Sequence, residues 1–321
     1  MPTPIVHVTA PSRLHFGLLS FGDVGARQFG GVGAMIQQPA VQLAISPAER
    51  LEVQGTLAQR ALEFARRWAV ANRIGNDLPC QIRILHAPRQ HVGLGVGTQL
   101  GLSVAAGLNT FFNRPNQSPE QLALSVGRCR RSTVGTHGFF EGGLIAEKGK
   151  LPDDSIAPLE ARVKLPEHWR FVLICPAVSA GLAGQQEREA FDQLPPVPRQ
   201  ITEQLVRELK QQMLPAAAEG RFDRFSDSIY RYGNTAGMCF AEQQGGPYNG
   251  PRLGELVELV RGLGVHGVGQ SSWGPTLFAL LPDRAAAEAF AGQLRNCTGE
   301  ESLQLTISAP CNCGAQIQVD R

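Results

Sequence analysis

Hydrophobic and polar residues alternate along several short stretches of the chain, and this period of two predicts β-strands. Residues 170–175 and 276–281 are almost entirely apolar, which is typical of strands covered on both faces. A further short strand is predicted at 142–146. The alternating strands are predicted at 3–9, 41–45, 81–85, 303–308 and 315–319.

Apolar residues recur at helical spacing in other stretches, which predicts amphipathic helices. Between residues 201 and 213 the apolar positions stand four apart. Residues 98–112 are mostly small and apolar, which indicates a buried helix in spite of Gly101 and Gly107. The remaining helices are predicted at 57–71, 253–263 and 284–295.

This mixture of elements predicts an α+β fold, with helices packed against largely antiparallel sheets. A polar stretch with two prolines at 150–158 is the candidate boundary between two domains. The predicted domains therefore cover residues 1–155 and 156–321. A chain of 321 residues has room for two ordinary domains that share one site.

Composition and charge narrow the class of protein. Lys and Arg number 30 against 28 Asp and Glu, and a net charge of +2 predicts no strong attraction to nucleic acid or to an anionic membrane. No apolar run approaches the roughly 18 residues that span a bilayer, and residues 1–10 lack the pattern of a signal peptide. Most of the seven cysteines stand singly, which favours reduced thiols in a cytoplasmic protein.

A glycine-rich loop between a predicted strand and the predicted buried helix carries the strongest chemical signal. Without Cβ atoms at alternate positions, its N–H groups can turn inward beside the positive end of the helix dipole, which suits a phosphate or diphosphate. The alternative is a tight strand-to-helix turn without a ligand. The candidate phosphate-binding residues are Gly93, Leu94, Gly95, Val96, Gly97, Thr98 and Gln99.

A second candidate segment follows the first predicted strand. Arg13 and His15 stand two apart in an extended segment, so their side chains are expected on the same face. Arginine suits bidentate recognition of phosphate or carboxylate. The alternative is a surface arginine beside a histidine at the edge of the core.

A third segment, residues 267–275, joins glycines and hydroxyls ahead of the strand at 276–281. It can line a polar pocket, and the alternative is a plain connecting loop. The candidate pocket residues are Ser12, Gln270, Ser271, Ser272 and Gly274.

Signals for a metal site are few. Glu187, which follows the strand at 170–175, is a candidate ligand, and a solvated helix start is the alternative. Cys311 and Cys313 form half of a metal-ligand pattern, but no second Cys or His pair with zinc spacing stands near them.

Taken together and in this order, the three segments resemble the three motifs of the GHMP small-molecule kinase superfamily, from about residue 5 to residue 320. The resemblance implies a two-domain α+β fold. The N-terminal domain of that fold contains a left-handed βαβ unit, an exception to the usual handedness, and the C-terminal domain is ferredoxin-like. In the superfamily the central loop cradles the phosphates of a nucleotide.

Two departures from the kinase pattern bear on the activity. The kinases usually read Gly-Leu-Gly-Ser-Ser-Ala at the central loop, where this chain continues from Gly95 with Val, Gly97, Thr and Gln. Many kinases carry an aspartate as the base for a substrate hydroxyl, and His137 stands at that position here. An ATP-dependent small-molecule kinase is therefore the alternative hypothesis.

The Gly-Leu-Gly-x-Gly-Thr-Gln loop closely resembles that of the β-ribofuranosylaminobenzene 5′-phosphate synthase family, as do residues 12–17, 181–187 and 270–276. Members of this family join 4-aminobenzoate to phosphoribosyl pyrophosphate (PRPP) with Mg²⁺ and release CO₂ and pyrophosphate. The reaction belongs to tetrahydromethanopterin biosynthesis. The resemblance thus implies a pentosyltransferase, small-molecule substrates, Mg²⁺ and, by analogy, a homodimer.

The resemblance also implies roles for individual residues. The glycine loop and Mg²⁺ would stabilise the departing pyrophosphate. Arg13 would hold the diphosphate, the 5′-phosphate or the benzoate carboxylate. His15 and His137 would orient a substrate or handle a proton. Because the ring attacks through the carbon that bears its carboxylate, loss of CO₂ restores aromaticity, and no strong base is needed at a hydroxyl.

Overall fold

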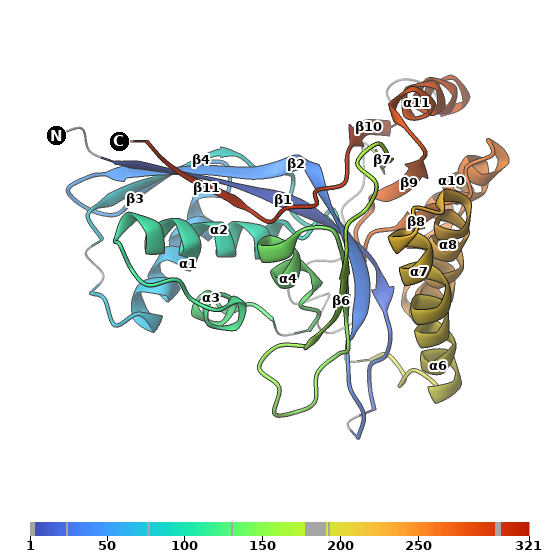
Figure 1. The fold of residues 1–321 in the computed structure, drawn as a ribbon, viewed down its shortest axis with the longest axis horizontal. Coiled ribbons are helices and arrows are strands. Elements are labelled where there is room, and N and C mark those ends of the chain that lie inside the picture. Colours follow the sequence, from blue (N-terminus) through green and yellow to red (C-terminus); the bar gives the residue numbers. More distant parts are fainter. Residues whose placement is uncertain are drawn as a thin grey trace.

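Two β-sheets and their helices make up the computed structural model, which describes residues 4–23, 25–75, 78–129, 131–176, 191, 193–298 and 303–320. The first sheet has the strand order β11-β1-β2-β4-β3, and β5 and β6 extend it along the other half of β2. Figure 1 shows this sheet spanning the molecule, with helices α1 to α4 on one face. Its strands are β1 (Ile5–Leu18), β2 (Gly31–Pro47), β3 (Glu52–Gly55), β4 (Cys80–His86), β5 (Leu144–Glu147), β6 (Leu159–Val163) and β11 (Gln316–Asp320).

The long antiparallel pair β1–β2 is the backbone of the first sheet. In the outer half of this pair, β1 pairs with β11 and β2 pairs with β4. In the inner half, which contains residues 12–18 of β1, β2 pairs with β5. The register between β1 and β2 shifts between Ala10 and Ser12 and again between His15 and Gly17. Such irregularities bend a strand and redirect its side chains. They bracket Arg13 and His15, which lie where the two halves meet.

Parallel pairing in the first sheet is confined, among the described strands, to β3 and β4. Helix α1 (Ala58–Ala71) connects these two strands, which gives the βαβ unit that the resemblance implies. The amphipathic pattern of α1 explains its position, because Ala61, Phe64, Ala65 and Trp68 are all buried.

Helix α2 (Val96–Phe111) lies between α1 and the sheet, and nearly all of its residues are buried. The prediction of a buried helix at 98–112 is thereby confirmed. Gly107 is needed for close packing, because a Cβ at this position would lie 2.8 Å from Cδ1 of Ile45. The short helices α3 (Pro119–Ser125) and α4 (Val134–Glu141) complete this layer.

The second sheet is antiparallel and has the order β10-β7-β9-β8. Along the chain its strands follow a β-α-β-β-α-β sequence, and the helices include α8 (Phe222–Met238) and α11 (Arg284–Thr298). This sequence and strand order are those of a ferredoxin-like domain, as expected. The strands are β7 (Arg170–Pro176), β8 (Val268–Gln270), β9 (Leu277–Leu281) and β10 (Leu303–Ser308).

The helices between β7 and β8 lie on the right of Figure 1, where the run from residue 199 to 218 packs against α8. Helix α6 (Arg199–Arg207) continues through a π-helical turn, η1 (Glu208–Met213), into α7 (Leu214–Ala218), so the predicted helix at 201–213 is one part of a longer helical run. The others are α9 (Ala241–Gln244) and α10 (Pro251–Gly262). No helix of the described residues is long and apolar enough to cross a membrane.

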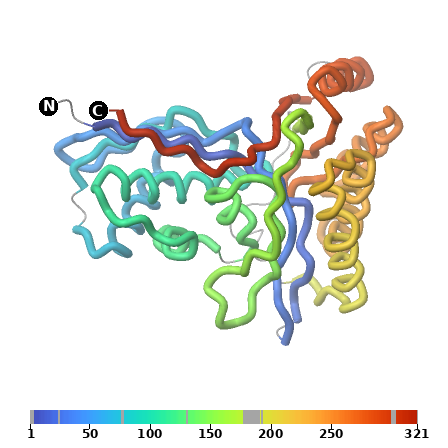
Figure 2. Tube along the Cα trace, in the orientation of Figure 1, coloured from blue at the N-terminus to red at the C-terminus, as the bar shows by residue number. Residues whose placement is uncertain are grey.

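The two sheets do not separate at one point of the chain. Strands β6 and β11 follow the predicted boundary at 155–156, and both pair within the first sheet. Figure 2 shows the end of the chain, in red, running back along the blue N-terminal strand. The predicted α+β class is confirmed, and the division into 1–155 and 156–321 stays a prediction about independent folding.

Candidate active site

Three segments that are far apart in the sequence meet where the two sheets adjoin. The N–H of Arg13 donates to the carbonyl of Leu94 (3.1 Å). The N–H of His15 donates to Oγ of Ser271 (3.0 Å), and the N–H of Ser272 donates to the carbonyl of His15 (3.1 Å). Oγ of Ser271 in turn donates to the carbonyl of Gly93 (2.7 Å). The three candidate motifs therefore form one hydrogen-bonded cluster.

Two glycines allow this close approach. A Cβ on Gly93, whose φ is +90°, would lie 2.1 Å from the carbonyl oxygen of Ser271. A Cβ on Gly274 would lie 2.2 Å from the backbone nitrogen of Gly93. Any side chain at either position would push the two loops apart, so their glycines are a requirement of backbone-to-backbone contact.

A cavity of about 760 Å³ opens beside this cluster. Its walls come from β1, the glycine loop, α1, the segment before α4, α8 and the loop before β9. Its lining residues fall into two groups of different chemistry. Arginines and the start of α2 form one group, called the positive end below, and aromatic rings form the other, called the aromatic end.

The start of α2 forms the positive end of the cavity. Gly95 caps the helix in the left-handed conformation (φ 69°), and the first turn contains no acidic residue. Nε of Arg13 lies 3.1 Å from the position of a Cβ on Gly95, and Nη2 of Arg60 lies 2.6 Å from that of a Cβ on Gly97. Arg128 donates to Oγ1 of Thr98 (3.0 Å).

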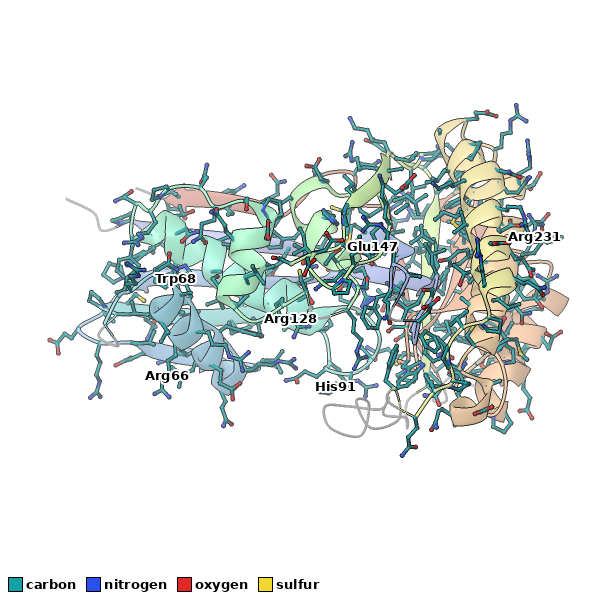
Figure 3. The ribbon with its side chains drawn as sticks, turned by 90° about the horizontal axis from the view of Figure 1, so that it is seen from below. Arg66, Trp68, His91, Arg128, Glu147 and Arg231 are labelled. Carbon is teal, nitrogen blue, oxygen red and sulfur yellow. The ribbon has the colours of Figure 1, made fainter. Side chains whose placement is uncertain are left out.

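Positive charge therefore surrounds a helix N-terminus whose N–H groups already favour anions. Arg67 and Arg131 also line the cavity, and Glu63 is the single carboxylate among its described lining residues. This imbalance suits a ligand with several negative charges, such as a diphosphate. Figure 3 shows Arg128 and His91 near the middle of the molecule, whereas Arg66 lies on α1, away from them.

The aromatic end is formed by Phe191, Phe240 and Trp273. The ring of Trp273 meets that of Phe240 edge to face at 5.2 Å between centroids, and that of Phe191 at 5.8 Å. The guanidinium of Arg131 lies 4.5 Å from the centroid of Phe191. All four residues line the cavity. An arginine over an aromatic ring suits a flat, anionic ligand.

A buried carboxylate supports the site from behind. Glu147 accepts a hydrogen bond from the N–H of Thr133 (2.7 Å) and others from the hydroxyls of Thr133 and Ser132. Ser132 also lies 3.1 Å from Nε2 of His15. His15, Ser132 and Glu147 are thus linked through one hydroxyl, and Figure 3 shows Glu147 in the interior.

Burial shifts the pKa of both titratable groups in this hydrogen-bonded series, Glu147 and His15. Burial raises the pKa of Glu147, and the hydrogen bonds from Thr133 and Ser132 lower it in part. Burial, assisted by the positive charge of Arg13, holds the pKa of His15 well below its usual range. His15 is therefore a neutral imidazole near pH 7, able to accept or donate one hydrogen bond at each ring nitrogen.

Most of the predicted residues are brought together at the cavity. Arg13 and His15 lie on the same side, as expected from their spacing. Six of the seven predicted phosphate-loop residues line the cavity, as do three residues of the last loop. The lining residues among those predicted are Arg13, His15, Gly93, Leu94, Gly95, Val96, Gly97, Thr98, Gln270, Ser272 and Gly274.

Four predicted residues have positions behind the cavity wall. Nε2 of Gln99 donates to the carbonyl of Gly135 (2.8 Å), and Oγ of Ser12 donates to that of Pro39 (2.5 Å). Ser271 joins the loops as described above. His137 is buried, and its Nε2 lies 2.8 Å from the carbonyl oxygen of Ala157. The structure therefore gives His137 a backbone contact within the core and no place on the cavity wall.

Metal binding has little support in the side chains of the site. No group of three or more His, Cys, Asp or Glu residues that could hold a metal occurs in the described part of the chain. Glu187 lies outside the described residues. Mg²⁺ usually needs only one or two protein carboxylates when a substrate supplies phosphate oxygens. The described lining residues do not form a metal site of their own, and Mg²⁺ stays a prediction.

Sequence reasoning missed several residues that the fold brings to the cavity. Arg60 lies in α1, and Arg128 and Arg131 stand in the irregular segment before α4. Phe240 follows α8, a helix whose pattern was not recognised. None of them belongs to a short motif. The one available signal was the cluster of basic residues at 128–131.

The fold and site define a protein with the architecture of the GHMP kinases. Residues 213–300 match the family described as GHMP kinases C terminal. A homoserine kinase from Cytophaga hutchinsonii shares the fold at 13% identity, with a TM-score of 0.67 over 98% of this chain and 97% of that one. A mevalonate diphosphate decarboxylase from Staphylococcus aureus does so at 11% identity and TM-score 0.65, over 98% of each chain.

More specific similarity is found with proteins named β-ribofuranosylphenol 5′-phosphate synthase. The one from Archaeoglobus fulgidus is 26% identical over 98% of this chain and all of its own length. The one from Methanothermobacter thermautotrophicus is 26% identical over 86% of this chain and 89% of its own. These findings confirm the resemblance seen in the motifs, the GHMP-type fold and the expectation that the chain is an enzyme.

Replacing Gly274 by alanine tests the contact between the loops. We expect Gly274→Ala to lower the free energy of unfolding by about 1–3 kcal/mol, the usual cost of overpacking, and to weaken pyrophosphate binding. Urea denaturation and calorimetric titration measure the two effects. The control is Gly292→Ala on α11, where an added Cβ meets nothing within 4 Å. Equal behaviour of the two variants would contradict the proposed constraint.

The low pKa of His15 predicts a dependence of stability on pH. The unfolded chain takes up a proton at His15 near pH 6.5, whereas the folded protein does not. Above this pH His15 is neutral in both states, so it does not lower the free energy of unfolding. Below it the free energy of unfolding falls as the pH falls, by at most about 1.4 kcal/mol per pH unit. In NMR spectra the midpoint of the His15 ring titration should lie well below pH 6.5, with the urea-unfolded chain as control. A midpoint near 6.5 in the folded protein would contradict the described burial.

Proposed function

We propose that this protein condenses 4-aminobenzoate with PRPP to give β-ribofuranosylaminobenzene 5′-phosphate, CO₂ and pyrophosphate, in tetrahydromethanopterin biosynthesis. One observation carries the proposal: a single cavity offers an arginine-rich helix N-terminus at one end and an aromatic cluster at the other. A diphosphate ester and an aromatic acid match these two surfaces. The names of the relatives specify a phenol product, so 4-hydroxybenzoate is the natural comparison substrate.

The positive end supports departure of the pyrophosphate. The bond from ribose C1 to the diphosphate oxygen breaks with its electron pair going to that oxygen, and positive charge develops on the sugar. Donors placed where negative charge accumulates lower such a barrier. Here the start of α2 with Arg13, Arg60 and Arg128 supplies them. Mg²⁺, when bound to the substrate's diphosphate, adds a further positive charge.

The acceptor supplies the electrons of the new bond. The ring carbon that bears the carboxylate bonds to ribose C1, and the carbon–carboxylate bond then breaks. Its electron pair returns to the ring, and CO₂ leaves. No proton has to be removed from carbon in this sequence. The site agrees with this chemistry, since burial holds the pKa of His15 well below its usual range, which makes this imidazole a weak base, and Glu147 lies behind the wall.

The alternative function is an ATP-dependent small-molecule kinase, which the shared fold and the phosphate loop would allow. In phosphoryl transfer, positioning and charge stabilisation dominate, so the same arginines would serve it. Against it stands His137, which lies in the core where the kinases would need a base at the substrate hydroxyl. Tight Mg-ATP binding without any response to PRPP would support the kinase.

Release of labelled CO₂ from carboxyl-labelled 4-aminobenzoate and 4-hydroxybenzoate, with and without PRPP in Mg²⁺ buffer, tests the proposal. We expect release that depends on PRPP. Arg13→Ala should reduce kcat/KM for PRPP at least tenfold, because a charged hydrogen bond contributes about 1.5–3 kcal/mol. The matched control is Arg66→Ala, on the exposed side of α1, which should stay within about twofold of the natural protein.

Two results would contradict these assignments. Absence of PRPP-dependent release, with a known synthase active in the same assay, would exclude the proposed reaction. Equal losses in the Arg13 and Arg66 variants would exclude contact between Arg13 and the phosphates.

A further inference from the structure

The aromatic end of the cavity has the features of a binding site for a flat ring. Phe240 and Trp273 meet edge to face, and Phe21 supports Phe240 from the core side at 5.0 Å between centroids. Gly233 and Gly237 of α8 also line the cavity. A planar ligand can therefore lie against the rings.

The loop that carries Trp273 is held in place by polar contacts. The side-chain amide of Gln270 donates to the carbonyl of Ser272 (2.8 Å), and its carbonyl oxygen accepts from the N–H of Asn249 (2.7 Å). The side chain of Asn249 reaches the carbonyl of Trp273 (3.4 Å). Hydrogen bonds within the protein thus hold the loop that carries the Trp273 indole.

Two residues of the cavity wall each carry a polar atom that is buried without a partner in the described part of the chain. The atoms are Oε1 of Gln244 and Nε1 of Trp273, and both residues line the cavity. Nε2 of Gln244 donates to the carbonyl of Gly237 (3.0 Å), which fixes the carboxamide and leaves its oxygen as an unused acceptor. An unsatisfied buried polar atom is unfavourable, so a ligand that supplies its missing partner gains affinity.

We propose that this end of the cavity is the subsite for the aromatic acceptor, and that Gln244 recognises the donor group, amine or hydroxyl, opposite the carboxylate. This proposal rests on the proposed function, and it gives the position at which the second substrate of that reaction, the aromatic acid, binds. The ring lies against Phe240 and Trp273, and the carboxylate-bearing carbon faces the arginine-rich end. Arg131, over Phe191, attracts the negative charge of the acid to this side.

The chemistry explains why an acceptor oxygen is useful at this position. When the ring attacks through its carboxylate-bearing carbon, positive charge spreads to the nitrogen or oxygen on the opposite carbon. That group then becomes a stronger hydrogen-bond donor, and the carbonyl oxygen of Gln244 accepts from it. The contact therefore strengthens in the transition state, which makes Gln244 a specificity-determining residue that also affects kcat.

Calorimetric titration with saturating pyrophosphate tests the subsite without turnover. The ligands are 4-hydroxybenzoate, 4-aminobenzoate and 4-fluorobenzoate, the last of which cannot donate a hydrogen bond. We expect the natural protein to bind the two donors about three- to tenfold more tightly than the fluoro compound, as one hydrogen bond allows. Gln244→Met should abolish this preference and leave pyrophosphate affinity unchanged.

The matched control is Gln243→Met, at the neighbouring exposed position of α9, which should keep the full preference. Trp273→Phe, which retains an aromatic ring but removes the N–H, should weaken all three benzoates and leave pyrophosphate affinity unchanged. A Gln244→Met variant that still prefers the donors, or that loses pyrophosphate affinity equally, would overturn the proposal.

The outcomes separate this proposal from the proposed function. PRPP-dependent release of CO₂ together with an unchanged ligand preference in Gln244→Met would leave the reaction standing and overturn the subsite. Loss of the preference in a protein that releases no CO₂ would support the aromatic subsite and contradict the reaction. No binding of any benzoate by the natural protein would contradict both.

Discussion

The contact between the glycine loop and the loop before β9 is the constraint on which the site depends. Gly93 and Gly274 bring two backbones within a distance that excludes any side chain. Ser271 then joins His15 on one side to Gly93 on the other. Residues from both sheets are therefore fixed to one another at this contact, and the cavity forms beside it.

The same arrangement separates the two chemical ends of the cavity. The start of α2 must lie beside the bent part of β1, because Gly95 and Gly97 leave room there for the side chains of Arg13 and Arg60. The aromatic rings come from other segments, after α8 and in the loop before β9. A polyanion and an aromatic acid can thus occupy one cavity with their reacting carbons between the two ends. This division is what distinguishes the site from a simple nucleotide cradle.

Local patterns in the sequence predicted much of the fold, since alternation and helical spacing depend on which face is buried. The strands at 81–85, 170–175 and 303–308 and the buried helix after the glycine loop were found in this way. The return of β11 to the first sheet was not, because pairing partners far apart in sequence leave no local signal. The spacing of apolar residues at 201–213 likewise did not predict the π-helical turn in the run from α6 to α7.

Site residues that act through the conformation of the backbone could be predicted from the sequence. Site residues that only tertiary packing brings to the cavity could not. Glycines at alternate positions point to a cradle in any fold, so Gly93, Gly95 and Gly97 were recognised. Arg60, Arg128 and Phe240 reach the cavity only because their elements pack around it. His137 was inferred from its place in a motif, and the structure buries it in the core beside the carbonyl oxygen of Ala157, so its role stays a prediction.

We propose that the positive end of the cavity holds the diphosphate of PRPP rather than the triphosphate of a nucleotide. Competitive calorimetric titration of the natural protein with PRPP and ATP in Mg²⁺ buffer measures which of the two ligands this end prefers. We expect one PRPP site per chain, with an affinity at least tenfold higher than that for ATP. ATP binding as tight as or tighter than that of PRPP would contradict it.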